Sequence, residues 1–137
     1  ALTERQDIVY RGIEGTTPPA VPAPQAEVSW SVMADPVLLF RYSALTFNGH
    51  RIHYDRPYAT RVEGYPGLVV HGPLQATLLL NLAKALQGVP RVFEFRGTGP
   101  LFDGAAFTVN AAQLAEGLEL WTADAAGFQA MRARATW

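Results

Sequence analysis

The sequence predicts an α+β domain in which a curved, five-stranded antiparallel sheet wraps around one central apolar helix. Three observations predict this class: one strand-like alternation before residue 35, an apolar stretch over residues 74–86, and four segments of period two after it. The 137 residues are 49% hydrophobic and 17% charged, which suits one compact domain of ordinary size.

The first residues look different from the rest of the chain. Residues 7–11 resemble the end of a strand, and glycines and prolines then crowd residues 12–24 in a run that cannot form a helix or a ladder. We therefore expect a terminal strand within residues 1–12, a semi-extended, proline-rich linker over residues 13–26, and the domain itself over residues 27–137.

One strand and two short helices open the domain. Alternating apolar side chains predict a half-buried strand over residues 27–32. Asp35 followed by Pro36 combines an N-cap with a first-turn proline, which predicts a helix over residues 37–45. Asp55, with a proline two positions later, predicts a second turn of helix near residues 56–61.

The central helix and four strands complete the domain. Residues 74–86 carry apolar side chains on nearly every side, with Gly88 and Pro90 closing the segment, so we expect a helix that is buried all round. Short turns, the clearest at residues 124–127, join the segments that follow, and these predict a four-strand antiparallel meander. The alternating residues are Phe93 and Phe95, then Phe107, Val109 and Ala111, then Leu118 and Leu120, then Phe128, Ala130 and Arg132.

Composition excludes several classes of function. A net charge of −1, from 11 Lys+Arg and 12 Asp+Glu, supplies no electrostatic footprint for nucleic acid or anionic lipid. The absence of cysteine excludes disulfides, a thiolate nucleophile and Cys-ligated metals. The longest apolar stretch is interrupted by Asn81 and Lys84 and is too short to span a bilayer. We expect a soluble, cytoplasmic domain that binds neither nucleic acid nor membrane.

All three histidines, His50, His53 and His71, fall within residues 50–71. An isolated loop histidine is most often a hydrogen-bonding surface or core residue. Three histidines could also form a zinc triad, but Arg51 lies between two of them and no carboxylate or Cys arrangement repeats a zinc spacing, so we expect no metal.

The start of the central helix permits a different chemistry. Gly72 and Pro73 at the N-terminus of a buried helix leave backbone N–H groups free, which can hold a carbonyl oxygen that gains negative charge. The same pair is also common at an ordinary junction between a loop and a helix. The nearby histidine loop favours the functional interpretation.

Two segments resemble a known family. Residues 42–53 read Tyr-Ser-Ala-Leu-Thr-Phe-Asn-Gly-His-Arg-Ile-His, with Ala59 shortly after, and residues 70–74 read Val-His-Gly-Pro-Leu. The first resembles the signature of the MaoC-like, or hydratase 2, branch of hot-dog-fold enzymes, in which an aromatic and a small, apolar stretch precede Gly-Asp-x-Asn-Pro-x-His and an Ala. The second is placed like the His-Gly segment that opens the hot-dog helix. Within the branch, the segments look most like the mesaconyl-C4-CoA (itaconyl-CoA) hydratases and mitochondrial 3-hydroxyacyl-thioester dehydratases.

The resemblance implies a hot-dog fold and reversible addition of water across the double bond of a 2-enoyl thioester, without a cofactor. His53 matches the family's catalytic His, and Gly72 matches the residue whose N–H polarises the thioester carbonyl. Asn48 stands where the family has its catalytic Asp, and it can orient water but cannot take up a proton. Asp55 could supply the missing carboxylate, although it also reads as a helix N-cap.

The remaining site residues are expected to bind substrate. His50 and Arg51 replace the family's Asn-Pro pair, and Arg51 is the expected counter-ion if the acyl chain carries a second carboxylate. Tyr65 and Pro66 could wall the acyl pocket or form a rigid turn, and His71 belongs to the His-Gly segment.

Two other functions stay open. Hot-dog proteins also hydrolyse acyl-CoA thioesters, usually with a carboxylate on or near the central helix, and residues 73–87 contain none. A non-catalytic half that pairs with an active partner is the other alternative, which Asn48 favours. The expected partners are an acyl-CoA or acyl-carrier-protein thioester and a second hot-dog domain, as a homodimer or as a separate or cleaved half. On this interpretation, residues 4–11 would be the last strand of a preceding half.

Overall fold

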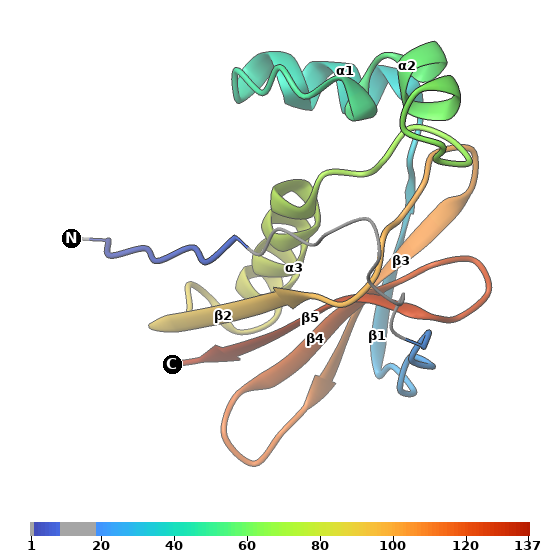
Figure 1. Ribbon diagram of the computed structural model, residues 1–137. Helices are drawn as coiled ribbons and strands as arrows, with labels where there is room; N and C mark the ends of the chain where they lie inside the picture. The colour runs from blue at the N-terminus through green and yellow to red at the C-terminus, as the bar shows by residue number, and fades with distance from the viewer. Residues whose placement is uncertain (1, 9–18) are drawn as a thin grey trace.

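The computed structural model describes residues 2–8 and 19–137, and the helices and strands between Val28 and Thr136 form the predicted α+β domain (Figure 1). The helix α3 lies against one face of a single five-stranded sheet, and two shorter helices, α1 and α2, stand beyond its first turn. In the described part of the chain, no helix is long and apolar enough to cross a membrane. The elements are β1 (Val28–Met33), α1 (Pro36–Leu45), the 3-10 turn η1 (Arg51–His53), α2 (Arg56–Arg61), α3 (Gly72–Gln87), β2 (Val92–Gly97), β3 (Ala106–Gln113), β4 (Leu118–Ala123) and β5 (Gln129–Thr136).

Both short helices begin where the sequence predicts. The Asp35 side chain accepts a hydrogen bond from the Leu38 N–H at 2.8 Å, and the Asp55 side chain accepts one from the Tyr58 N–H at 3.1 Å. Each helix also has a proline in its first turn. These bonds satisfy N–H groups that a helix start leaves without partners, so local chemistry alone determines both starts.

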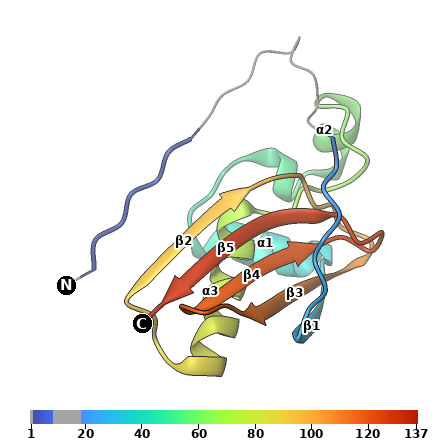
Figure 2. The same ribbon diagram turned by 90° about the horizontal axis from the view of Figure 1, so that it is seen from below.

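The sheet has the strand order β1-β3-β4-β5-β2, with every neighbouring pair antiparallel. Figure 2 shows β2 and β1 at opposite edges. The prediction of a four-strand meander is therefore wrong for one strand: β3, β4 and β5 form a meander, but β2 pairs with β5. Since α3 runs along the sheet and only residues 88–91 separate it from β2, that strand forms where the helix ends, and residues 98–105 return the chain to β3.

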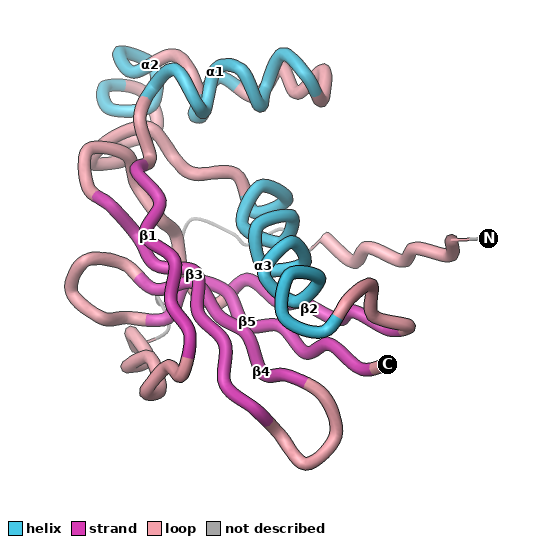
Figure 3. Tube along the Cα trace, turned by 180° about the vertical axis from the view of Figure 1, so that it is seen from behind, coloured by secondary structure: helices cyan, strands magenta, loops and turns pink. Residues whose placement is uncertain are grey.

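The core lies between α3 and the sheet. Gln75 of α3 accepts a hydrogen bond from the Thr122 hydroxyl of β4 at 2.7 Å, so a satisfied polar pair crosses this interface. The prediction that this helix is buried all round is wrong, because Leu80 is 37% and Leu86 is 40% exposed. Figure 3 shows the sheet along one side of α3 only, so these side chains face away from it. Fully or nearly fully buried side chains include Leu74, Leu79, Leu82, Val109, Leu118 and Leu120.

Strand β5 contains a β-bulge. Thr122 of β4 lies opposite Met131, but the next residue, Ala123, lies opposite Gln129. Ala130 is therefore an extra residue without a ladder partner. An extra residue changes the phase of a strand, because successive side chains point to opposite faces.

The bulge determines which side chains of β5 reach the core. Met131 is buried whereas Arg132 is exposed, so the strict alternation that placed Arg132 on the same face as Phe128 is wrong. The bulge has a second use, because the Ala130 carbonyl accepts hydrogen bonds from the amides of residues 98 and 99, at 2.8 Å and 3.0 Å. The extra residue thus anchors the start of the connection from β2 to β3.

Parts of the N-terminal predictions lie outside the described residues, namely residue 1 and residues 9–12 of the segment expected to hold a terminal strand and residues 13–18 of the expected linker. Residues 2–8 contain neither helix nor strand. The prediction that the proline-rich run joins no ladder is wrong at Pro22, which forms an antiparallel bridge with Phe128. The amides of Ala23 and Gln129 make the flanking hydrogen bonds, both at 2.8 Å, so the bridge does not require the N–H that proline lacks.

Candidate active site

The chain leaves α1 by a sharp turn that leads into the histidine loop. The Phe47 N–H bonds to the Ala44 carbonyl at 3.3 Å and the Asn48 N–H to the Ser43 carbonyl at 2.9 Å, which is the closing pattern of a Schellman motif. Such a motif needs a left-handed residue, usually glycine, and Phe47 adopts it with a φ of 53°. Its side chain is 96% exposed. A bulky residue in this conformation is strained, and such strain concentrates at functional sites.

Asn48 holds the loop that follows. Its side-chain oxygen accepts a hydrogen bond from the His50 N–H at 3.0 Å. The Tyr54 hydroxyl donates to the Gly49 carbonyl at 2.9 Å and closes the loop from its other end. The amide oxygen of Asn48 is thus already engaged with the backbone, and its NH2 group still has its hydrogens to donate.

His53 ends the turn η1 and is 8% exposed. Its Nδ1 lies 2.7 Å from the Val69 carbonyl oxygen. A carbonyl can only accept, so Nδ1 carries the hydrogen and the lone pair is on Nε2. Burial lowers the pKa of His53, the hydrogen bond to Val69 raises it, and His50 lowers it, with a net shift downward. The imidazole is therefore neutral at physiological pH, with one nitrogen available as a base.

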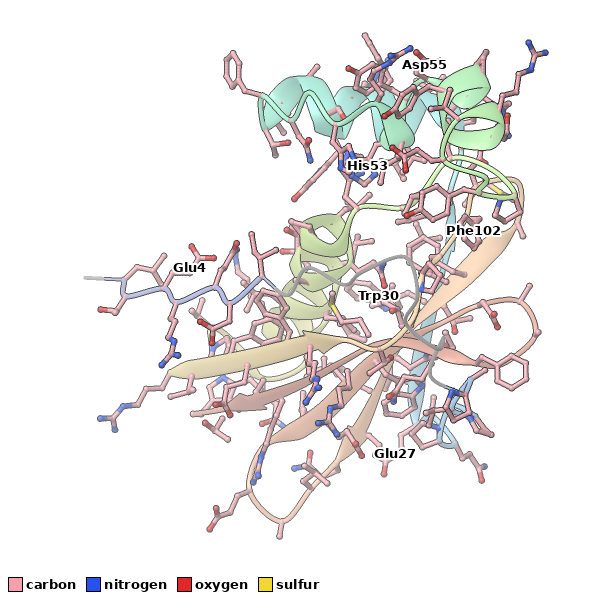
Figure 4. All side chains as sticks on the ribbon, in the orientation of Figure 1. Glu4, Glu27, Trp30, His53, Asp55 and Phe102 are labelled. Atoms are coloured by element: carbon pink, nitrogen blue, oxygen red, sulfur yellow. The ribbon has the colours of Figure 1, made fainter. Side chains whose placement is uncertain are left out.

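The three histidines form one cluster between α1 and the start of α3, where Figure 4 shows His53. The rings of His53 and His71 stack with 3.7 Å between centroids and an interplanar angle of 17°. The His50 ring meets His53 edge-on at 5.5 Å. His71 is fully buried, and its Nε2 lies 2.8 Å from the Ser43 hydroxyl. Burial, followed by the nearby His53, lowers the pKa of His71 to about 4.

Arg51 faces α2 rather than the histidine cluster. Its Nε and one terminal nitrogen bond to the same Asp55 oxygen at 3.0 Å and 2.8 Å, and its guanidinium carbon lies 4.0 Å from the centre of the Tyr58 ring. The Asp55 hydrogen bond raises the pKa of Arg51, and the same bond lowers the pKa of Asp55. The interpretation of Asp55 as a helix N-cap is confirmed, and its carboxylate is committed to the cap and the ion pair.

Tyr65 packs against the core, with its ring 6.0 Å from that of Phe102, and Pro66 is exposed. The loop holding them is anchored by Asp103, which pairs with Arg56 and accepts the Leu68 N–H at 2.8 Å. These contacts are those of a rigid turn, and they do not bring the two residues to the histidine cluster.

Gly72 follows His71 directly and begins α3, where the first N–H groups of a helix have no acceptor within it. An added Cβ at Gly72 would lie 3.9 Å from the Met131 side chain. A cleft of about 740 Å³ opens beside this glycine, and it is lined by residues 5–8, Gly72, Pro73, Phe93, Glu94, Phe95, Gly97 and Met131. The helix start therefore meets a partly apolar cleft, which the three histidines themselves do not line.

The cluster does not have the geometry of a metal triad. His53 directs Nδ1 to Val69 and His71 directs Nε2 to Ser43, and the two rings stack face to face, so their nitrogens do not converge on a point. Over residues 2–8 and 19–137, no group of three or more His, Cys, Asp or Glu side chains could hold a metal ion.

Sequence reasoning missed two residues of α1 that contact the cluster. Ser43 bonds to His71, and the Tyr42 ring meets the His71 ring edge-on at 4.8 Å. One signal was available: Ser43 lies four residues after Leu39, so both occupy the buried face of α1. A lone serine on an apolar helix face indicates a buried polar partner.

Comparisons with known sequences agree on one family. The model of the hydroxyacyl-thioester dehydratase type 2 family matches residues 1–103. The chain is 54% identical over 115 residues to mesaconyl-C(4)-CoA hydratase of Chloroflexus aurantiacus, covering 80% of this chain and 41% of that protein. It is 43% identical over 79 residues to the mitochondrial hydroxyacyl-thioester dehydratase type 2 of Schizosaccharomyces pombe, covering 54% of this chain and 26% of that one. The chain thus spans less than half the length of these relatives.

Comparisons with solved structures confirm the hot-dog fold. HtdX of Mycobacterium tuberculosis superposes with a TM-score of 0.69 at 21% identity, covering 92% of this chain and 50% of that one. The (R)-hydratase PhaJ1 of Pseudomonas aeruginosa gives 0.67 at 16% identity, covering 85% and 83%. The ChsH1–ChsH2 complex of M. tuberculosis, a heteromeric assembly, contains a chain with a TM-score of 0.64 at 14% identity, covering 85% and 93%.

Proposed function

Because the chain belongs to the hydroxyacyl-thioester dehydratase type 2 family, we propose that it adds water reversibly to a 2-enoyl thioester, with His53 as the acid/base. The observation that carries this proposal is the state of His53. Its Nδ1–H is held by the Val69 carbonyl, which leaves the Nε2 lone pair on a buried, neutral ring. A general base needs that combination of fixed orientation and an available lone pair.

In the direction of hydration, the Nε2 of His53 takes a proton from water, and the water oxygen bonds to the β-carbon. The electron pair of the double bond moves toward the thioester carbonyl, whose oxygen gains negative charge. The protonated His53 then returns a proton to the α-carbon, so that OH and H have been added and the enzyme is unchanged. Dehydration follows the same steps in reverse.

Gly72 is proposed to hold the carbonyl oxygen through its backbone N–H. A donor at a helix start gains from the helix dipole and costs no reorganisation as charge develops. The adjoining cleft supports the proposal, because Phe93, Phe95 and Met131 give it an apolar lining beside this N–H where an acyl chain could lie.

Asn48 and His50 are proposed to position the reacting water and the substrate. The Asn48 oxygen already holds the His50 amide, so its NH2 group is the part that would bind water. Arg51 is proposed to contact an acyl carboxylate only through the terminal nitrogen that Asp55 does not occupy. Tyr65 and Pro66 are proposed to shape the substrate-binding region through the turn that they form. His71 is proposed to support His53, on whose ring it stacks.

The proposed substrate is an acyl-CoA or acyl-carrier-protein thioester, such as that of a C4–C5 dicarboxylic acid. The 54% identity to a protein named mesaconyl-C(4)-CoA hydratase supports a dicarboxylic acyl chain. The cytoplasmic location expected from the sequence stays a prediction.

The proposed partner is a second hot-dog domain. Exposed apolar side chains lie on the outer faces of α1 and α3, among them Val37, Phe40, Leu80 and Leu86. Exposed apolar side chains of this kind favour association when they gather on one face. The heteromeric neighbour and the greater length of the relatives are consistent with a paired arrangement, in which residues 4–11 would belong to the preceding half.

One experiment separates hydration from the two alternatives. The purified chain is incubated with crotonyl-CoA and with mesaconyl-CoA, while enoyl absorbance and free thiol are both followed. Loss of absorbance without thiol supports hydration, thiol release alone supports a thioesterase, and neither signal supports a non-catalytic half. His53→Ala should abolish hydration. Asn48→Asp should retain some of it, because aspartate can still accept the His50 amide but lacks the NH2 group proposed to bind water. A fully active His53→Ala variant would contradict the mechanism.

A further inference from the structure

His71 is enclosed on several sides by groups that leave its ring no freedom. It is fully buried, one ring face stacks on His53, and its edge meets the ring of Tyr42. The Ser43 hydroxyl bonds to its Nε2 at 2.8 Å and prevents rotation about the side-chain axis. Three elements, α1, η1 and the start of α3, therefore meet at one imidazole.

Packing alone does not account for a histidine at this place. Across the described residues, the Nδ1 of His71 is the buried side-chain nitrogen or oxygen that has no hydrogen-bond partner. A buried polar atom without a partner costs about 1–3 kcal/mol. A hydrocarbon ring of similar size would remove the unpartnered nitrogen but would leave the buried Ser43 hydroxyl without its partner, so the imidazole serves Ser43 and His53 as well as filling volume.

The charge state of His71 matters to its neighbour. A protonated His71 would place a buried charge against the His53 ring at 3.7 Å, which would oppose protonation of His53 during turnover. Burial instead keeps His71 uncharged at physiological pH, since it lowers the pKa to about 4. A neutral ring covers one face of His53, excludes water from it, and does not compete for the proton.

We propose that His71 is a positioning residue for His53, which it fixes by stacking and shields from water on one ring face. The inference rests on the proposed function only for the activity measurement. Through His71, the Ser43 hydroxyl of α1 controls the orientation of the base, although neither Ser43 nor His71 contacts the reacting atoms.

The other groups around His53 give the proposal a specific electrostatic setting. His50 is the remaining titratable ring in contact, from the loop before η1. From α1, the titratable neighbour is Tyr42, which touches His71 rather than His53. At the start of α2, Arg51 and Asp55 neutralise each other, and the first turn of α3 carries no charged side chain. The ring face toward His71 is therefore the face whose solvation decides how readily His53 binds a proton.

The first test measures His53 directly, by NMR of the ¹⁵N-histidine-labelled chain across a pH series. We expect His71→Ala to admit water and raise the His53 titration midpoint by about one pH unit. His71→Phe loses the Ser43 bond, but its larger ring is held by packing over the same face of His53, so its midpoint should stay closer to that of the wild type than the His71→Ala midpoint does. An unmoved midpoint in His71→Ala, or a shift in His71→Phe as large as that in His71→Ala, would overturn the proposal.

Ser43→Ala removes only the hydroxyl that holds His71, so it tests the positioning role of His71 even if His71→Ala does not fold. Loosening His71 should lower kcat for crotonyl-CoA hydration about ten-fold and leave KM within about two-fold, because positioning acts on the reaction step. The acid limb of its pH–rate profile should move up with the His53 midpoint. Wild-type kcat together with an unmoved midpoint would overturn the inference. Because the NMR experiment needs no turnover, an absence of hydration by the wild type would refute the proposed function and leave the stacking test intact.

Discussion

Acidification is expected to destabilise this fold through the stacked histidines before its carboxylates become protonated. The pKa of His71 falls from 6.5 to about 4 on folding, and that of His53 also falls. Both groups thus bind protons more readily in the unfolded chain. Their contribution to stability is complete above pH 6.5 and is lost as the pH falls toward the folded pKa values.

The size of the effect follows from proton linkage. One proton taken up on unfolding changes the free energy of unfolding by about 1.4 kcal/mol per pH unit. His71 alone should therefore cost about 2 kcal/mol between pH 6.5 and pH 5, and about 3 kcal/mol once pH 4 is reached. His53 adds to this loss. Above pH 5, ordinary carboxylates are largely ionised in both states, so this window reports the histidines.

Urea unfolding at several pH values, followed by tryptophan fluorescence, measures the effect. Trp121 is 1% exposed and should report loss of the sheet. The matched variant is His71→Phe, which keeps a ring and removes the titrating group, so it should lose about 2 kcal/mol less between pH 6.5 and pH 5. A wild-type stability that is flat across this window, or an equal slope in the two proteins, would refute the reasoning.

Three further predictions concern stability and are measured by urea unfolding. Asp103→Ala should lower the free energy of unfolding by about 2–3 kcal/mol, because the 1%-exposed carboxylate holds both Arg56 and the Leu68 amide. The control is the exposed cap variant Asp35→Ala, and a loss no larger than that of this control would contradict the prediction. Gly117→Ala and Gly127→Ala both place alanine at positive φ, but the new Cβ would lie 2.0 Å from the Ala135 carbonyl oxygen at the first and in open space at the second. Gly117→Ala should therefore lose at least about 2 kcal/mol more stability than Gly127→Ala. Equal losses would show that the backbone moves to relieve the contact with the Ala135 carbonyl, and would contradict the prediction. Phe47→Gly should stabilise the chain by about 1 kcal/mol by relieving the left-handed backbone, and a loss of stability would mean that the phenyl ring makes compensating contacts.

Local chemistry made part of this structure predictable. The caps Asp35 and Asp55 specify helix starts through bonds that span three residues, so the sequence alone places α1 and α2. The identity of each strand was equally readable from alternation. The partner of β2 was not, because it depends on how far α3 carries the chain across the sheet, and alternation contains no such information.

The candidate site shows the same division. Its residue types and order pointed to His53, Gly72 and Asn48. The stacking of His53 on His71 depends on where α1 and α3 pack, and the engagement of Arg51 with Asp55 rather than with the cluster depends on a side-chain rotamer. Neither is encoded in spacing alone.

The bulge in β5 also predicts where this strand tolerates a change of length. Deleting Ala130 would join Gln129 to Met131 as a regular strand, and every later side chain would keep its face. Deleting Arg132 instead would shift Arg134 into the row opposite Leu120, where a guanidinium would be buried against α3. The sheet can therefore lose one residue at the bulge, although the carbonyl that anchors residues 98 and 99 is lost with it. A residue lost just beyond the bulge would instead exchange the buried and exposed side chains of the rest of the strand.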